Sequence, residues 1–243
     1  MHYWGLTDPG CVRTQNQDAY QITKLDRNTL LCVVCDGMGG AKSGNVASNL
    51  AVDVFSQEVK QSWSADMDQK RLDQMLYSAV KLANFTVYDQ SQQFEEFTGM
   101  GTTMVAALIH GKKVTVVNVG DSRCYHIGAN GIRQVTVDHS VVQMMVARGE
   151  VTPEQAKRYP GKNLITRAIG TEPVVMSDIF HQKVERGDCL LLCTDGLSNL
   201  IDEQEILFEV VYGQDKERCG ERLLQIAKNR GAPDNVTSVL VII

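Results

Sequence analysis

Short apolar runs recur along the chain and predict buried β-strands. Six such runs are rich in aliphatic or β-branched residues: Leu30 to Cys35, Thr103 to Ile109, Val114 to Val119, Arg123 to Ile127, Cys189 to Thr194 and Val236 to Ile243. Several of them lack an alternating polar face, which indicates that both faces of those strands are covered. The pattern predicts sheets with other layers packed on them.

Helical patterns occur in two pairs. Residues 46–55 and 72–87, between the first two predicted strands, carry apolar side chains three and four positions apart. Residues 202–211 and 215–229 form a second amphipathic pair. Since helices do not follow every strand, a doubly wound parallel sheet is disfavoured. We predict an α+β fold in which helical pairs cover antiparallel sheets.

No boundary divides the chain into separate domains. Only five prolines occur in 243 residues, and no Pro/Gly/Ser-rich linker or charge block interrupts the pattern. Apolar residues make up 43% and charged residues 22%, the balance of an ordinary globular protein. We expect one domain that spans residues 1–243.

Charge and hydropathy exclude two classes of partner. The net charge is −5 and the basic residues are scattered, so no basic stripe is available for nucleic acid. The longest apolar runs are about a third of the roughly 20 residues that a membrane span needs. The first residues show no secretory leader, and seven cysteines, an odd number, suit reduced thiols. We therefore expect a cytoplasmic protein.

Cys32 and Cys35 have a Cys-x-x-Cys spacing that zinc sites and redox motifs also use. They lie within a predicted strand, however, where residues three apart point to opposite faces. We interpret both as small core residues.

Aspartates stand at the ends of four predicted strands. Asp36, Asp121 and Asp195 each end an apolar run, and Asp234 stands just before the last one. Singly, each is a common turn residue. Together, carboxylates at one end of a sheet repel each other unless a cation neutralises them. Oxygen-only ligation suits Mg²⁺, Mn²⁺ or Ca²⁺ and argues against zinc.

Eight motifs in order resemble a known family. They are Arg13 to Asp18, Asp36 to Gly40, Gly101 to Thr103, Gly120 to Arg123, Asp138 to Ser140, Ile165 to Gly170, Thr194 to Gly196, and Asp234 with Asn235. In this series the chain is similar to the type 2C metal-dependent Ser/Thr protein phosphatases. Met38 and the segment from Val141 to Ile165 resemble the bacterial branch, which opposes Ser/Thr kinases.

The resemblance implies a fold and an activity. The fold would be a four-layer α-β-β-α sandwich, two antiparallel sheets flanked by helical pairs. The activity would be hydrolysis of phosphoserine and phosphothreonine in proteins by a metal-activated water. The partners would be phosphoproteins, including a Ser/Thr kinase and its substrates.

The resemblance also implies a site for two or three Mg²⁺ or Mn²⁺ ions. Asp36 would bridge two ions, and the Gly37 carbonyl would complete the second position. Asp195 and Asp234 would hold the first ion, and Asp121 with Asp195 would hold a third.

Two further residues would serve catalysis without binding a metal directly. Asp18 would orient the attacking water, a role that needs a carboxylate. Arg13 would clamp two phosphate oxygens in a bidentate way that lysine cannot reproduce.

Three positions depart from commoner forms of the family. Gln17 replaces a frequent Glu, Asn199 stands where many members have Asp, and Met38 replaces a His often proposed as the general acid. The proton donor is therefore not identified. These departures keep open a catalytically dead binding module with the same fold. A phosphatase dedicated to one small regulatory protein is a third reading.

Residues 141–163 resemble a flap beside the active site of the bacterial members. The bland alternative is a surface helical hairpin. We hypothesise that the flap contacts the phosphoprotein and sets turnover. Just before it, Ser140 and Gln143 have capping-box spacing, so we interpret His139 as structural.

Overall fold

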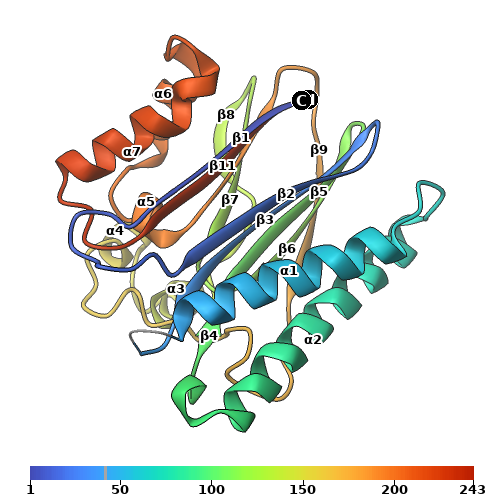
Figure 1. Cartoon of the computed structure of the whole chain (residues 1–243). Helices are drawn as coiled ribbons and strands as arrows, with labels where there is room; N and C mark the ends of the chain where they lie inside the picture. The colour runs from blue at the N-terminus through green and yellow to red at the C-terminus, as the bar shows by residue number, and fades with distance from the viewer. Residues whose placement is uncertain (41–42) are drawn as a thin grey trace.

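Two antiparallel sheets stack face to face, and helices cover the outer face of each (Figure 1). This architecture is taken from a computed structural model, which describes residues 1–40 and 43–243. The α+β class and the four-layer order predicted from the sequence are confirmed.

The first sheet has the strand order β1-β11-β10-β7-β8. Its strands are β1 His2–Asp8, β7 Arg123–Gly128, β8 Gly131–Gln134, β10 Cys189–Cys193 and β11 Val236–Ile242. The helices of its outer layer are α5 Asp195–Ser198, α6 Glu203–Tyr212, η2 Lys216–Arg218 and α7 Cys219–Asn229. The first and last strands of the chain pair with each other, His2 opposite Ile242.

The second sheet has the order β2-β3-β5-β6-β9. Its strands are β2 Asp18–Asp26, β3 Thr29–Met38, β5 Met104–His110, β6 Lys113–Val119 and β9 Asp178–Lys183, and β4 Gly101–Thr102 pairs with the end of β3. Over its outer face run α1 Gly44–Ser62 and α2 Gln69–Gln93, followed by η1 Glu95–Phe97. Two short helices, α3 Val141–Ala147 and α4 Pro153–Ala156, lie between β8 and β9 in the chain.

All six predicted strands are present, as β3, β5, β6, β7, β10 and β11. Five strands were not predicted: the two-residue strand β4, and β1, β2, β8 and β9, which are the edges of the two sheets. Edge strands are partly exposed and therefore carry a weaker apolar signal, as the burial of β1 and β9 shows.

The hydrophobic core consists of three layers. One lies between the two sheets, with Leu30, Val105 and Leu192 among its members. A second lies between the second sheet and α1 and α2, and a third between the first sheet and α6 and α7. Cys35 belongs to the helix-facing layer and Cys32 to the layer between the sheets, so the predicted opposite orientation of these two residues is confirmed.

The seven cysteines are all unpaired, and only Cys11 is exposed. The longest described helix, α2, buries one face against the second sheet. Across the two described segments, no helix has both the length and the apolarity needed to cross a bilayer.

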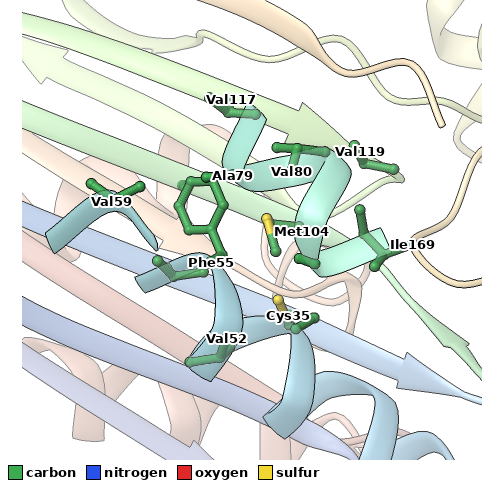
Figure 2. Packing of buried hydrophobic residues seen from close by; sticks show 14 of the residues in the cluster. Cys35, Val52, Phe55, Val59, Ala79, Val80, Met104, Val117, Val119 and Ile169 are labelled. Carbon is green, nitrogen blue, oxygen red and sulfur yellow. The ribbon is translucent and has the colours of Figure 1, made fainter. Parts of the chain in front are cut away.

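Phe55 fills the centre of the layer beneath α1 and α2, where Figure 2 shows it near Ala79 of α2 and Met104 of β5. Its side chain is fully buried. We predict that Phe55→Ala lowers the free energy of unfolding by about 3–5 kcal/mol, because the change removes buried area and leaves a cavity.

Urea unfolding would measure this loss. Phe85→Ala is the matched control, since Phe85 on α2 is 60% exposed and its truncation should change stability by about 0.5 kcal/mol or less. An equal loss in both variants would contradict the described packing of α1.

Candidate functional site

Five aspartates converge at one end of the two sheets. Asp18 opens β2 and is paired with Asp36 near the end of β3. Asp121 follows β6, Asp195 opens α5 just after β10, and Asp234 precedes β11. Because neighbouring strands are antiparallel, the end of one lies beside the start of the next. The structure therefore brings together all five aspartates that the sequence singled out.

The pKa values of the first two carboxyls reflect this crowding. Burial, together with the charges of Asp18, Asp195, Asp121 and Asp234, raises the pKa of Asp36 well above its usual range. Burial also raises the pKa of Asp18 to about 7, against the opposing effect of the nearby Thr237 and Thr194 hydroxyls. In the protein without cations, charge at this end of the sandwich is therefore unfavourable near neutral pH.

Asp121 and Asp195 show the same effect. Burial raises the pKa of Asp121 to about 7, with a further contribution from the charge of Asp195. Burial and then the charge of Asp234 raise the pKa of Asp195. Four carboxyls with raised pKa values in one place constitute a site that favours cations.

Asp18 is held through only one of its two carboxylate oxygens. Thr194 Oγ1 donates to Asp18 Oδ2 at 2.9 Å, and the Thr237 amide donates to Thr194 Oγ1 at 3.1 Å. Asp18 Oδ1 is buried and has no hydrogen-bond partner among the described residues. Leaving a buried oxygen without a hydrogen-bond donor is unfavourable. A bound water or cation would satisfy this atom.

The backbone around Asp36 is fixed by three hydroxyls. The Asp36 amide donates to Thr103 Oγ1 at 3.0 Å, and Thr102 Oγ1 donates to the Asp36 carbonyl at 2.9 Å. Ser122 Oγ lies 2.7 Å from Thr103 Oγ1 and completes the group. Asp36 is thereby anchored to the strand and loop that carry Asp121.

Gly37 stands where no side chain fits. A Cβ at this position would lie 2.0 Å from the Gly44 carbonyl oxygen and 2.5 Å from the Gln17 carbonyl oxygen. The Gly37 amide also donates to the Gln17 carbonyl at 3.0 Å. Close backbone approach therefore requires glycine here. That its own carbonyl binds a metal stays a prediction.

Asp234 forms an ion pair with Arg13. Arg13 Nη2 donates to Asp234 Oδ2 at 2.9 Å, and the two side chains are 52% and 38% exposed. Arg13, the predicted phosphate clamp, thus lies at the carboxylate cluster, and its guanidinium is partly exposed to solvent.

Asn235 positions the loop that carries Arg13. Its Nδ2 donates to the carbonyls of Pro9 and Gln15 at 3.0 and 2.9 Å, and its Oδ1 accepts from the Gln17 amide at 2.8 Å. Asn235 is nearly fully buried, so these contacts replace solvent for three backbone groups. The side chain next to a predicted ligand therefore anchors the predicted clamp.

Asn199 contacts both a carboxylate of the cluster and the flap. Its Nδ2 donates to Asp195 Oδ2 at 2.9 Å and lies 3.4 Å from Asn163 Oδ1. Two backbone hydrogen bonds join the beginning of the flap to its end. The Val141 amide donates to the Leu164 carbonyl, and the Thr166 amide donates to the His139 carbonyl.

His139 supports the loop before Asp121. Its ring is almost completely buried and its Nδ1 accepts from the Gly120 amide at 3.1 Å, which agrees with a structural role. Ser140 caps α3 by accepting from the Gln143 amide at 3.3 Å, as the sequence predicted.

The donor set fits hydrated divalent ions better than a closed protein cage. Within residues 1–40 and 43–243, no group of three or more His, Cys, Asp or Glu has the geometry to hold an ion by itself. Asp195 and Asp234 are each engaged by a protein donor, as described above. Mg²⁺ characteristically keeps several waters and takes only one or two carboxylates from the protein. Buried carboxylates with raised pKa values and the partnerless Asp18 Oδ1 fit such ions.

Sequence reasoning missed the residues that position the aspartates. Thr194, Asn235 and Thr103 were part of the quoted motifs, but no role was assigned to them. Two of them could have been found from their position, because Thr194 and Asn235 are each adjacent in sequence to a predicted metal ligand.

Comparison with known proteins places the chain in a family. The family model described as Protein phosphatase 2C matches residues 12–240. The chain is 34% identical over 241 residues to the Serine/threonine phosphatase stp of Listeria welshimeri, covering 99% of this chain and 95% of that protein. It is 33% identical over 236 residues to the Protein phosphatase PhpP of Streptococcus pneumoniae, covering 97% and 95%. The Serine/threonine protein phosphatase PstP of Mycobacterium tuberculosis is 33% identical over 240 residues, which cover 99% of this chain and 44% of that longer protein.

Solved structures agree over the whole chain. The crystal structure of the phosphatase Stp1 from Staphylococcus aureus is 39% identical, with a TM-score of 0.90, and covers 99% of this chain and 94% of that one. The crystal structure of the Mycobacterium tuberculosis phosphatase PstP/Ppp is 32% identical, with a TM-score of 0.89, and covers 100% and 98%. The resemblance drawn from eight motifs is confirmed, and the chain belongs to the protein phosphatase 2C family of Ser/Thr protein phosphatases, on the branch of its bacterial members.

Proposed function

We propose that residues 1–243 form a single catalytic domain that hydrolyses phosphoserine and phosphothreonine in proteins and opposes a bacterial Ser/Thr kinase. The observation that carries this proposal is the convergence of five aspartates at one end of the sandwich, with pKa values of four of them raised. Kinase substrates, and the kinase itself, are the partners that this chemistry implies. The six buried thiols support a reducing, cytoplasmic location.

Two or three Mg²⁺ or Mn²⁺ ions would be held at this end. Asp36 would contribute to two positions, the Gly37 carbonyl to the second, Asp195 and Asp234 to the first, and Asp121 with Asp195 to the third. When bound, such ions supply Lewis-acid activation of water and offset charge on the phosphoryl oxygens. The dependence on metal ions goes with the family, whereas the ions' identity and number are part of the proposal.

Asp18 would orient the attacking water. Thr194 fixes one oxygen of its carboxylate and leaves Oδ1 without a partner. The pKa of Asp18 is about 7 in the protein without ions, and bound cations would favour the carboxylate form, which accepts a hydrogen bond from water.

Arg13 would bind the substrate phosphate. In the protein without ions its guanidinium forms an ion pair with Asp234. If Asp234 held a cation, the guanidinium would be free to bind another anion. Two of its parallel N–H groups then match two phosphate oxygens.

The binding-module alternative draws no support from Gln17 and Asn199. Gln17 Nε2 donates to the Gly40 carbonyl at 3.3 Å and Asn199 donates to Asp195, so both amides are used in support of the site. Neither displaces an aspartate of the cluster.

Hydrolysis of a phosphothreonine peptide tests the proposed activity directly. We expect activity with Mn²⁺, none with excess chelator, and a kcat/KM lower by about 100-fold or more in Asp195→Asn, because a direct ligand should matter at least as much as its supporting groups. Asp53→Asn, an exposed change on α1, is the control. An inactive but folded wild-type protein in saturating Mn²⁺ would favour the binding module.

The second prediction concerns pH and stability. The raised pKa values of Asp18 and Asp121 mean that the folded protein without ions binds more protons than the unfolded chain between the ordinary value near 3.8 and about 7, and the raised pKa values of Asp36 and Asp195 act in the same direction. Its stability should therefore fall as pH rises through this window. Since a bound cation favours the charged carboxylates, the increase in Tm caused by Mn²⁺ should be larger at pH 7.5 than at pH 5.5.

Thermal unfolding at both pH values, with chelator and with Mn²⁺, would measure this difference. Asp36→Asn should reduce it, and Asp53→Asn should not. An equal increase in Tm at the two pH values would show that the cluster is not what the ion stabilises.

The third prediction concerns the clamp. Arg13→Lys keeps the charge but loses the bidentate geometry, so we expect KM for a phosphothreonine peptide to rise about tenfold or more. Steady-state kinetics in saturating Mn²⁺ would measure it, with Arg27→Lys, at the exposed β2–β3 turn, as control. An unchanged KM would assign Arg13 to the ion pair with Asp234 alone.

A further inference from the structure

A groove leads away from the carboxylate cluster. It has a volume of about 590 Å³ and lies between the flap helices α3 and α4 on one side and α5 with the start of α6 on the other. Asp121 and Asp195 both line it, so it is continuous with the site where the phosphate would bind. A volume in this range accommodates several atoms beyond a phosphoryl group.

The two walls of the groove carry opposite charge. Lys157 and Lys162 outnumber Glu154 on the flap wall, while Asp202 and Glu203 lie on the wall formed by the start of α6. The positive charge of Lys162 acts on Asp195, which places it toward the phosphate end. Farther along the α6 wall, Glu205 and Arg230 neutralise each other in an ion pair.

Glu203 is the carboxylate of that wall with no structural task. Asp202 Oδ1 caps α6 by accepting from the Glu205 amide at 2.9 Å. Glu203 is exposed, lines the groove, and makes no ion pair or side-chain hydrogen bond with the residues that the structure describes. Its charge is therefore available to whatever occupies the groove.

Apolar side chains also line the groove. Val146 and Ala156 come from the flap segment, and Leu200 and the buried Ile201 come from the segment between α5 and α6. An occupant with an extended backbone, one apolar side and a positive group on the α6 side would match these surfaces. A polypeptide that continues from the phosphorylated residue satisfies all three conditions.

We propose that this groove binds the substrate polypeptide next to the phosphorylated residue, and that Glu203 makes the enzyme prefer substrates with Lys or Arg there. The inference rests on the proposed function, since it requires that the phosphate occupy the carboxylate cluster. It deepens that function by specifying the substrates as proteins with Lys or Arg near the phosphorylated residue.

The test compares phosphothreonine peptides that differ only in charge. One series carries Arg two and three residues on either side of the phosphothreonine, and the other carries Glu at the same positions. The ratio of their kcat/KM values, in saturating Mn²⁺, does not depend on how much of a preparation is folded. We expect wild type to favour the Arg series by about threefold to fivefold, the range of partly exposed charge pairs, and less at high salt.

Glu203→Lys should abolish or invert this ratio. Glu217→Lys is the matched control, because Glu217 carries the same charge, is exposed, and does not line the groove. It should leave the ratio at the wild-type value.

Three outcomes would overturn the inference. Equal use of both series by wild type excludes a charged recognition groove, as does an unchanged ratio in Glu203→Lys. An equal effect of Glu217→Lys would assign the preference to the overall charge of the protein. If wild type hydrolyses no phosphopeptide in Mn²⁺, the proposed function fails first; hydrolysis without preference leaves that function intact and refutes the groove alone.

Discussion

The structure depends on one electrostatic constraint, the gathering of negative charge at one end of a stack of two sheets. Asp18 and Asp36 are paired in the ladder of β2 and β3, and Asp121, Asp195 and Asp234 each stand two positions from the end of a strand, so the strands hold all five in place. Hydrogen bonds and one ion pair offset part of the repulsion between the carboxylates. Thr194 holds one oxygen of Asp18, Arg13 neutralises Asp234, and Asn199 contacts Asp195.

The same constraint explains why the surrounding backbone is so closely packed. The carbonyl oxygens of Gly44 and Gln17 approach Gly37 closely enough to exclude any Cβ there. Likewise, a Cβ on Gly196 would lie 1.9 Å from the Asn235 carbonyl oxygen. The first contact packs the segments beside β2 and β3 together, and the second packs those beside β10 and β11, at positions where no other residue type fits.

The sequence was sufficient for the interior of the fold. The central strands β3, β5 and β10 have continuous apolar runs because both of their faces are buried, and such runs can be recognised without any partner. The edge strands β1, β2, β8 and β9 were missed because nearly all of their residues meet solvent or lie at intermediate depth. Their pairing is decided by neighbours distant in sequence, which a local pattern does not contain.

Four aspartates of the site were predictable from the pattern, because Asp36, Asp121 and Asp195 end apolar runs and Asp234 precedes one, whereas Asp18 was identified through the resemblance. Their supporting contacts were not predictable. Thr194 and Asp18 are 176 positions apart, and Asn235 reaches carbonyls 226 and 220 positions away. Such hydrogen bonds follow from the stacking of the sheets. The ion pair between Arg13 and Asp234 was equally hidden, since the resemblance suggested a partner for each residue but not each other.

The pairing of β1 with β11 has a consequence for how the chain can be joined to others. His2 lies opposite Ile242, so both termini leave the sandwich side by side (Figure 1). They do so at the far end of the seven-residue strand β11, which is about 20 Å long at about 3.3 Å per residue and begins just after Asp234 and Asn235. A tether, a fused module or a linker that closes the two ends into a circular permutant would therefore project away from the carboxylates and leave access to them open.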